Sequence, residues 1–230
     1  MRSLKAKMIL TAGLILLPFS SLAQTINSVY IDQVGSNSTI SMTQTGSNNK
    51  LGDETQSAIF TGNNQVVAIM QVGANNVGNF NIQGSNATVT SNVTGNLNTV
   101  TATCGASGTT SCTDTAIEAN ATGGGNTLTA TVGGKSTAKI NVTGDTNTAT
   151  ITSTTSNMAG SRAEITSTGG DSNNLSISQN GPAGLNGFTA KVEVTGGGNI
   201  IGVTQTGTVD STVNVKSTGS NNNITVHSGN

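Results

Sequence analysis

Two consecutive segments decide the fold of this chain. They read NSVYIDQVGSN at residues 27–37 and STISMTQTGSN at residues 38–48. Each contains a glutamine followed two residues later by a glycine, and Gln33 and Gln44 are eleven residues apart. Self-similarity at a fixed spacing is the signature of repeat architectures, so the spacing predicts a repeat fold.

The same frame continues towards the C-terminus. The Gln-x-Gly element returns in VAIMQVGAN at residues 67–75 and in VTQTG at residues 203–207. Elsewhere a Gly-x-x-Asn turn keeps the frame, at residues 95–98, 123–126, 144–147, 196–199 and 219–222. Extra residues interrupt it around 51–56 and 104–113, and we expect both insertions to loop out.

Between the turns, apolar and polar residues alternate with period two. Examples are Val29/Ile31/Gln33, Ile40/Met42/Gln44, Val67/Ile69/Gln71, Leu175/Ile177/Gln179 and Ile201/Val203/Gln205. Alternation of this kind predicts half-buried strands, and glycine and asparagine supply the positive φ angles of tight corners. Strand, corner, strand and corner make a rung of about 22–23 residues. The expected fold is an all-β, two-sided β-solenoid.

Glutamine recurs at an inward position of the alternation. Its side-chain amide can bond the same residue one rung away, which forms a ladder and satisfies a buried polar group. The predicted ladder residues are Gln33, Gln44, Gln71, Gln179 and Gln205. The predicted corner glycines are Gly35, Gly46, Gly73 and Gly207.

The N-terminus has the layout of a secretory signal peptide. Three basic residues precede an apolar run at 8–17 that is too short to span a bilayer of about 30 Å, and small residues precede a cleavage site after Ala23. We therefore expect a signal peptide at 1–23 and a repeat domain at 24–230, with no membrane segment after cleavage. An uncleaved anchor is the alternative.

Composition argues against several functional classes. Only 8% of residues are charged and 2% aromatic, without a basic patch, so nucleic acid is not an expected partner. His227 is the single histidine and the acids are scattered, so we expect no catalytic residues, metal site or cofactor, and no enzyme. Cys104 and Cys112 are predicted to form a disulfide, with free thiols as the alternative.

The segments resemble the curlin repeat of bacterial curli subunits, which reads about Ser-x5-Gln-x-Gly-x2-Asn-x5-Gln. Gln33, Gln44, Gln71 and Gln205 each begin a matching Gln-x-Gly element. In the first repeats we place the family's asparagine at Asn37, Asn48 and Asn75, which lie two residues after glycine where the family has three. The resemblance covers residues 27–86 and 174–223.

This resemblance implies a structural subunit of extracellular, cell-surface amyloid fibres, which build biofilm matrix and mediate adhesion. The implied partners are further copies of the chain in a homo-polymer, together with a curli-type secretion pore and a nucleator subunit.

A different function stays open because threonine recurs at outward positions. The runs are Thr99/Thr101/Thr103, Thr127/Thr129/Thr131 and Thr148/Thr150/Thr152. Stacked on a flat face, they would form a lattice suited to a monomeric solenoid that binds ice or glycan, as an adhesin or fibre tip. A monomeric solenoid must cover its end rungs, and the sequence offers no capping element beside the last strand, at 223–227.

Overall fold

The computed structural model describes residues 26–104, 116–133, 136–153, 161–180, 189–207 and 211–229. Within these ranges the regular secondary structure is β-strand alone. Among the same residues, no helix has the length and apolar character needed to cross a membrane. The predicted signal peptide lies outside the described residues and stays a prediction.

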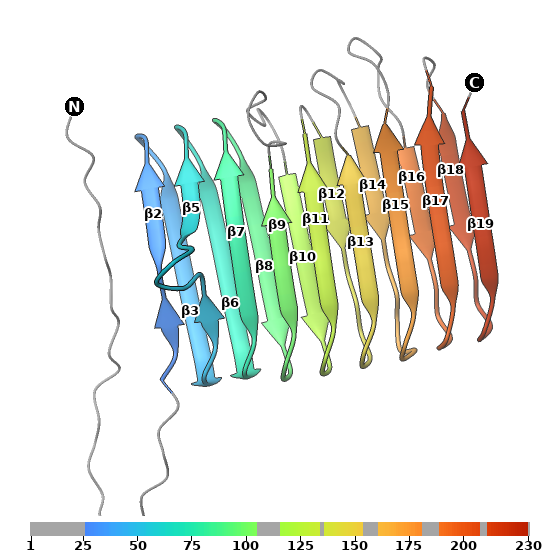
Figure 1. Cartoon of the computed structure of the whole chain (residues 1–230), viewed down its shortest axis with the longest axis horizontal. Helices are drawn as coiled ribbons and strands as arrows, with labels where there is room; N and C mark the ends of the chain where they lie inside the picture. The colour runs from blue at the N-terminus through green and yellow to red at the C-terminus, as the bar shows by residue number, and fades with distance from the viewer. Residues whose placement is uncertain are drawn as a thin grey trace, which may run out of the picture.

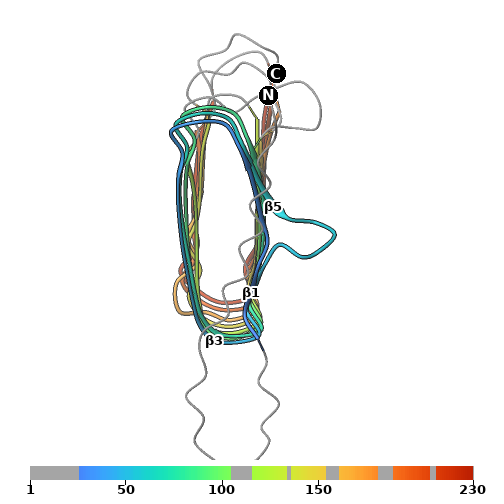
Figure 2. The same ribbon diagram turned by 90° about the vertical axis from the view of Figure 1, so that its left-hand side faces the viewer.

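The strands form two parallel sheets that face each other (Figure 2). Sheet A comprises β1 (Ser28–Val29), β2 (Ile31–Val34), β4 (Lys50–Leu51), β5 (Ala58–Thr61), β7 (Val77–Gln83), β9 (Thr99–Thr103), β11 (Thr127–Val132), β13 (Thr148–Ser153), β15 (Asn174–Asn180), β17 (Ile200–Thr206) and β19 (Asn223–Ser228). Sheet B comprises β3 (Thr39–Ser47), β6 (Val66–Ala74), β8 (Thr88–Thr94), β10 (Ala116–Thr122), β12 (Ser136–Ile140), β14 (Ser161–Ile165), β16 (Thr189–Glu193) and β18 (Thr212–Lys216).

The chain alternates between the sheets, so each rung contributes one layer to both. Successive rungs stack along the long axis of the molecule (Figure 1). The predicted β-solenoid is confirmed. Equivalent residues of neighbouring rungs are between 21 and 28 residues apart, because insertions lengthen several rungs beyond the predicted spacing.

Inward residues of both sheets fill a thin apolar interior. Leu128, Ile151 and Leu175 are fully buried, whereas the outward residues between them stay partly or fully exposed. Burying one such side chain contributes about 1.5–3 kcal/mol. The period-two alternation therefore determines both the strands and the face that each strand buries.

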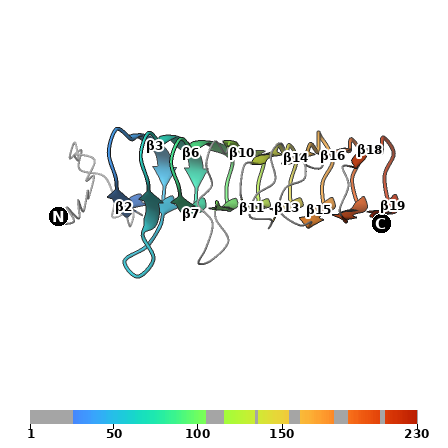
Figure 3. The same cartoon turned by 90° about the horizontal axis from the view of Figure 1, so that it is seen from above.

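Residues 52–57 interrupt the second rung between β4 and β5 and project from the outer face of sheet A (Figures 2 and 3). The Asp53 carboxylate accepts hydrogen bonds from the Thr55 hydroxyl, the Thr55 N–H and the Gln56 N–H at 2.6–2.7 Å. These donors lower the pKa of Asp53. The first predicted insertion is this loop, and much of the second lies outside the described residues.

Candidate functional site

The two ends of the solenoid are the first candidate site. At one end β1, β2 and β3 pair with strands on one side only, and at the other end β18 and β19 do the same. No other described element covers either end (Figure 1). Each end therefore presents a row of unpaired main-chain N–H and C=O groups, which is a template for further strands.

The inward side chains of these end rungs differ from their equivalents in the middle. Leu128 and Ile177, in middle rungs, are at most 1% exposed. Inward residues of the end rungs are only partly buried, namely Val29, Ile31, Ile40, Met42, Ile224 and Val226. A further rung laid on either end would bury this apolar surface.

A column of asparagines runs between the two ends. In the part of the chain that the structure describes, eight turns from sheet B to sheet A have the sequence Gly-x-x-Asn. We call them asparagine corners: residues 46–49, 73–76, 95–98, 123–126, 144–147, 170–173, 196–199 and 219–222. Their last residues, together with Asn27, form the asparagine ladder: Asn27, Asn49, Asn76, Asn98, Asn126, Asn147, Asn173, Asn199 and Asn222.

The ladder repeats one hydrogen-bond pattern. In every step, the main-chain N–H and the side-chain Nδ2 of one asparagine donate to Oδ1 of the asparagine one rung earlier, at 2.9–3.3 Å. Asn98 also donates to the Gly123 carbonyl at 2.8 Å. Its fully buried amide is thus satisfied on both sides.

The Gly-x-x-Asn pattern is the sequence signal for this ladder, but the pattern alone predicts a turn and does not show that its asparagine is buried. Asn48 and Asn75, two residues after glycine, lie at the third corner position with φ near +55° to +59°. Asn49 and Asn76, three residues after glycine, lie in the ladder. The first two asparagine corners therefore keep the spacing of the curlin pattern.

The first glycines of the asparagine corners stack on one another. A Cβ on Gly46 would lie 2.0 Å from the Gly73 carbonyl oxygen, and a Cβ on Gly95 would lie 1.8 Å from that of Gly123. The main chains of successive corners approach too closely for any side chain. The predicted corner glycines Gly46 and Gly73 belong to this stack.

The other two predicted corner glycines lie at turns from sheet A to sheet B. Gly35 has a φ of +136° and Gly207 a φ of +131°. A Cβ on Gly35 would lie 1.8 Å from the Gly62 carbonyl oxygen, so close stacking also requires glycine there.

The structure brings four of the five predicted ladder glutamines together in two pairs. Gln44 donates to Oε1 of Gln71 at 2.7 Å, and Gln179 donates to Oε1 of Gln205 at 2.8 Å. Gln33 does not join them. It is in register with Phe60, and its amide donates to the Gly35 carbonyl at 3.4 Å.

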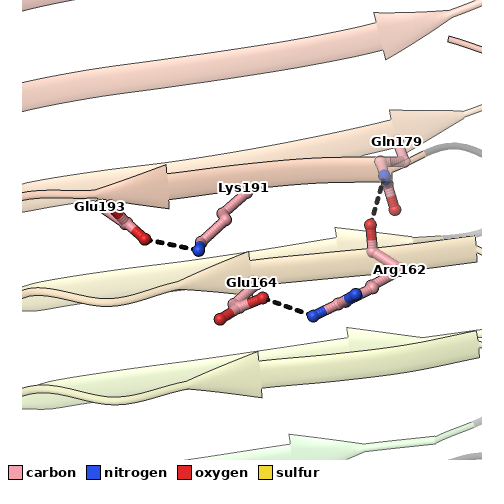
Figure 4. Close-up of polar contacts among 5 residues, drawn as sticks. All are labelled: Arg162, Glu164, Gln179, Lys191 and Glu193. Carbon is pink, nitrogen blue, oxygen red and sulfur yellow. Dashed lines mark hydrogen bonds and ion pairs between the residues drawn. The ribbon is translucent and has the colours of Figure 1, made fainter. Parts of the chain in front are cut away.

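The paired glutamines also form hydrogen bonds between the two sheets. Gln71, on sheet B, donates to the Lys50 carbonyl of sheet A at 3.1 Å. Gln179, on sheet A, donates to the Arg162 carbonyl of sheet B at 3.1 Å (Figure 4). The interior thus has polar cross-links beside its apolar packing.

Charged residues lie on the outer faces. Figure 4 shows Arg162 paired with Glu164 along β14 and Lys191 paired with Glu193 along β16. The Lys191 ammonium group lowers the pKa of Glu193, and Glu193 raises the pKa of Lys191. The Lys191–Glu193 pair is partly exposed on both sides and therefore adds little stability.

Asp32 lies on the outward side of β2, in a groove of about 590 Å³ between the 52–57 loop and sheet A. Its Oδ1 is buried and has no hydrogen-bond partner among the described residues. Nearby, the Tyr30 hydroxyl donates to Glu54 at 3.2 Å. Partial desolvation and the Glu54 carboxylate raise the pKa of Tyr30.

Cys104 follows β9 at an inward position, where it is fully buried and disulfide-bonded. Cys112, the partner predicted from the sequence, lies outside the described residues.

The family model of the Curlin associated repeat matches residues 26–46, which contain β1, β2 and most of β3. No curated protein and no solved structure matches the chain. The matched repeat and the β-solenoid fit a structural protein of the curli kind. The predicted resemblance is thus confirmed over the first rung: the chain carries a curlin associated repeat at residues 26–46.

Proposed function

We propose that this chain is a non-catalytic structural subunit, exported through a cleaved signal peptide, that stacks into extracellular amyloid-type fibres. These fibres serve as biofilm matrix and mediate surface adhesion. One observation carries the proposal: the inward apolar side chains of both end rungs are only partly buried, beside unpaired strand edges. Further copies of the chain bury this surface and pair these edges.

The interior ladders give the fibre its register, because a one-residue slip would place each inward residue on the outer face. Low overall charge permits end-to-end growth, and scattered acids and lysines limit sideways clumping. A curli-type secretion pore and a nucleator subunit are the further partners of this proposal, and they follow from the curlin repeat alone.

The test is to incubate the purified chain without residues 1–23 and record fibre X-ray diffraction. We expect reflections near 4.8 Å and about 10 Å. Val226→Lys places a charge on the inward side of the last strand and should prevent growth, whereas Ser176→Lys, on the outer face of β15, should assemble normally. A wild-type chain that stays a β-rich monomer for days would overturn the proposal.

A second candidate function rests on the threonine array. Thr99, Thr127 and Thr148 are in register, and so are the threonines two and four residues further along each strand. They form three columns on the outer face of sheet A. A monomeric solenoid could bind ice or glycan through this lattice. Ice-growth inhibition or glycan binding by a monomer that forms no fibres would favour this function.

A further inference from the structure

The structure also indicates how two copies would be joined, an inference that rests on the proposed fibre. Among the described residues, sheet A has nine stacked layers, β1 to β19, and sheet B has eight, β3 to β18. The chain therefore both enters and leaves the described solenoid on sheet A.

This unequal division argues against simple translation along the axis. Placing β1 and β2 of the next copy on β19 leaves one layer of sheet B empty between β18 and the next β3. Placing the next β3 directly on β18 makes the next β1 and β2 collide with β19. The empty layer in sheet B would leave the inward side chains of Val213 and Val215, which are 8% and 7% exposed, without a strand packed over them.

We propose instead that each copy is turned by half a turn about the long axis, so that its sheet A continues sheet B of the previous copy. The two sides of a rung are equivalent enough to permit this. Asn27 and Gly35, which flank β1 and β2 of sheet A, are eight residues apart, and so are Ser211 and Gly219, which flank β18 of sheet B. The half-turn keeps all strands parallel and leaves no layer empty.

The residues that meet at this junction are complementary. Val29 and Ile31 of the next copy lie against Val213 and Val215, and its Ile40 and Met42 lie against Ile224 and Val226. All of them are inward apolar residues of end rungs. The junction therefore buries the apolar surface of both ends.

The charges of the outward residues at the junction also favour this register. The half-turn places Asp32 of the next copy beside Lys216, the outward residue at the end of β18. Within one copy, Lys216 is in register with Glu193, and Asp32 is in register with the uncharged Ile59. The buried Oδ1 of Asp32, which has no partner among the described residues, would gain a cation.

Gly219 supports the same geometry. The first glycine of each earlier asparagine corner is required because a Cβ would strike the main chain of the next corner, at 2.5 Å for Gly196. A Cβ on Gly219 would meet only the Asn222 side chain, at 3.6 Å. Nothing within the described chain requires glycine there. In the half-turn junction Gly35 of the next copy stacks directly on Gly219, as glycines do elsewhere.

Cysteine cross-linking tests the register. In the half-turn junction, Asp32→Cys and Lys216→Cys lie on adjacent paired strands, about 4.8 Å apart and within disulfide reach. Simple translation would instead pair position 32 with position 227, since Asp32 and His227 end one column of sheet A. The matched control is therefore Asp32→Cys with His227→Cys. Each pair lies at opposite ends of one copy, so any cross-link joins two copies.

Both double variants are grown from wild-type seeds, oxidised and run on non-reducing gels. We expect ladders of covalent oligomers from the 32/216 variant and monomers from the 32/227 variant. Fibres that cross-link only through 32/227, or through neither pair, overturn the half-turn and leave the proposed fibre intact. A wild-type chain that forms no fibres refutes the proposed function itself.

Charge reversal gives a second measurement for the case in which the cysteine variants add poorly to seeds. Asp32→Lys and Lys216→Asp should each slow seeded elongation, by about two- to fivefold for a pair that is partly exposed to solvent. The combination should restore the rate, whereas His227→Gln should leave it unchanged. Slow elongation of the combined variant, or a rate that depends on His227 and not on Lys216, contradicts the junction.

Discussion

At the residue scale, the asparagine ladder shows how a polar side chain can hold an apolar interior together. Each internal member accepts two hydrogen bonds at Oδ1 and donates from Nδ2 to the rung before it. Because the amide is buried, a residue that cannot both accept and donate these hydrogen bonds leaves polar groups unsatisfied on two neighbouring rungs.

Asn98→Ala should therefore lower the free energy of unfolding by at least about 2 kcal/mol, since buried unsatisfied groups cost about 1–3 kcal/mol each. Urea denaturation of the soluble chain, before assembly, measures the change. Asn92→Ala is the matched control, because Asn92 is an exposed asparagine of β8 and its loss should change stability by less than about 0.5 kcal/mol. Equal effects of the two substitutions would argue against the ladder.

Leu97 is a residue whose conformation conflicts with its type. It has a φ of +60° and is 64% exposed, at the corner position where other rungs have Asn48, Asn75 or Gly125. A left-handed conformation costs an ordinary residue about 1–2 kcal/mol. Leu97→Asn should therefore stabilise the chain by about 1 kcal/mol, visible as a higher melting temperature. A lower melting temperature would show that Leu97 makes a stabilising contact.

At the scale of the elements, the sequence predicted the strands, their inward faces and the two-sided rung, because alternation and an eleven-residue frame leave few other folds. It also placed Gln33 in one ladder with Gln44, which the structure does not show. Residues eleven apart lie half a rung apart, on opposite sheets. The Gln44–Gln71 pair spans 27 residues, a full rung with its insertion. The spacing of the repeats alone does not show which of the two turns in a rung buries its asparagine.

The asparagine corners depend on glycine for close stacking. In Gly95→Ala the new Cβ would lie 1.8 Å from the Gly123 carbonyl oxygen. Since neither main chain can move independently of its strands, we expect a loss of about 3 kcal/mol or more. Gly202→Ala, whose Cβ would meet only Ser176 Oγ at 3.8 Å, is the control and should be nearly neutral. The melting temperatures of the two variants, measured under the same conditions, test whether the corner stack requires glycine at position 95.

At the scale of the whole molecule, a solenoid is nearly one-dimensional, and each rung is stabilised by its neighbours. A middle strand such as β11 pairs on both sides, whereas β3, β18 and β19 pair on one. The ends should therefore open more often than the middle.

Hydrogen exchange should show this gradient directly. In the soluble chain, the amides of β9, β11 and β13 should exchange most slowly, and those of β3 and β19 much faster. In fibres the end strands should become as protected as the middle. End strands that stay equally unprotected in fibres would mean that growth does not proceed through them.

The 52–57 loop gives the fibre a further property. It projects from the outer face of sheet A and is held by its own turn around Asp53, so its sequence is largely independent of the interior. In a fibre joined by half-turns, these loops would project from alternate sides, and loops on one side would recur about every 80 Å at a layer spacing of about 4.8 Å. Peptides inserted there would be displayed at regular intervals along both sides of the filament.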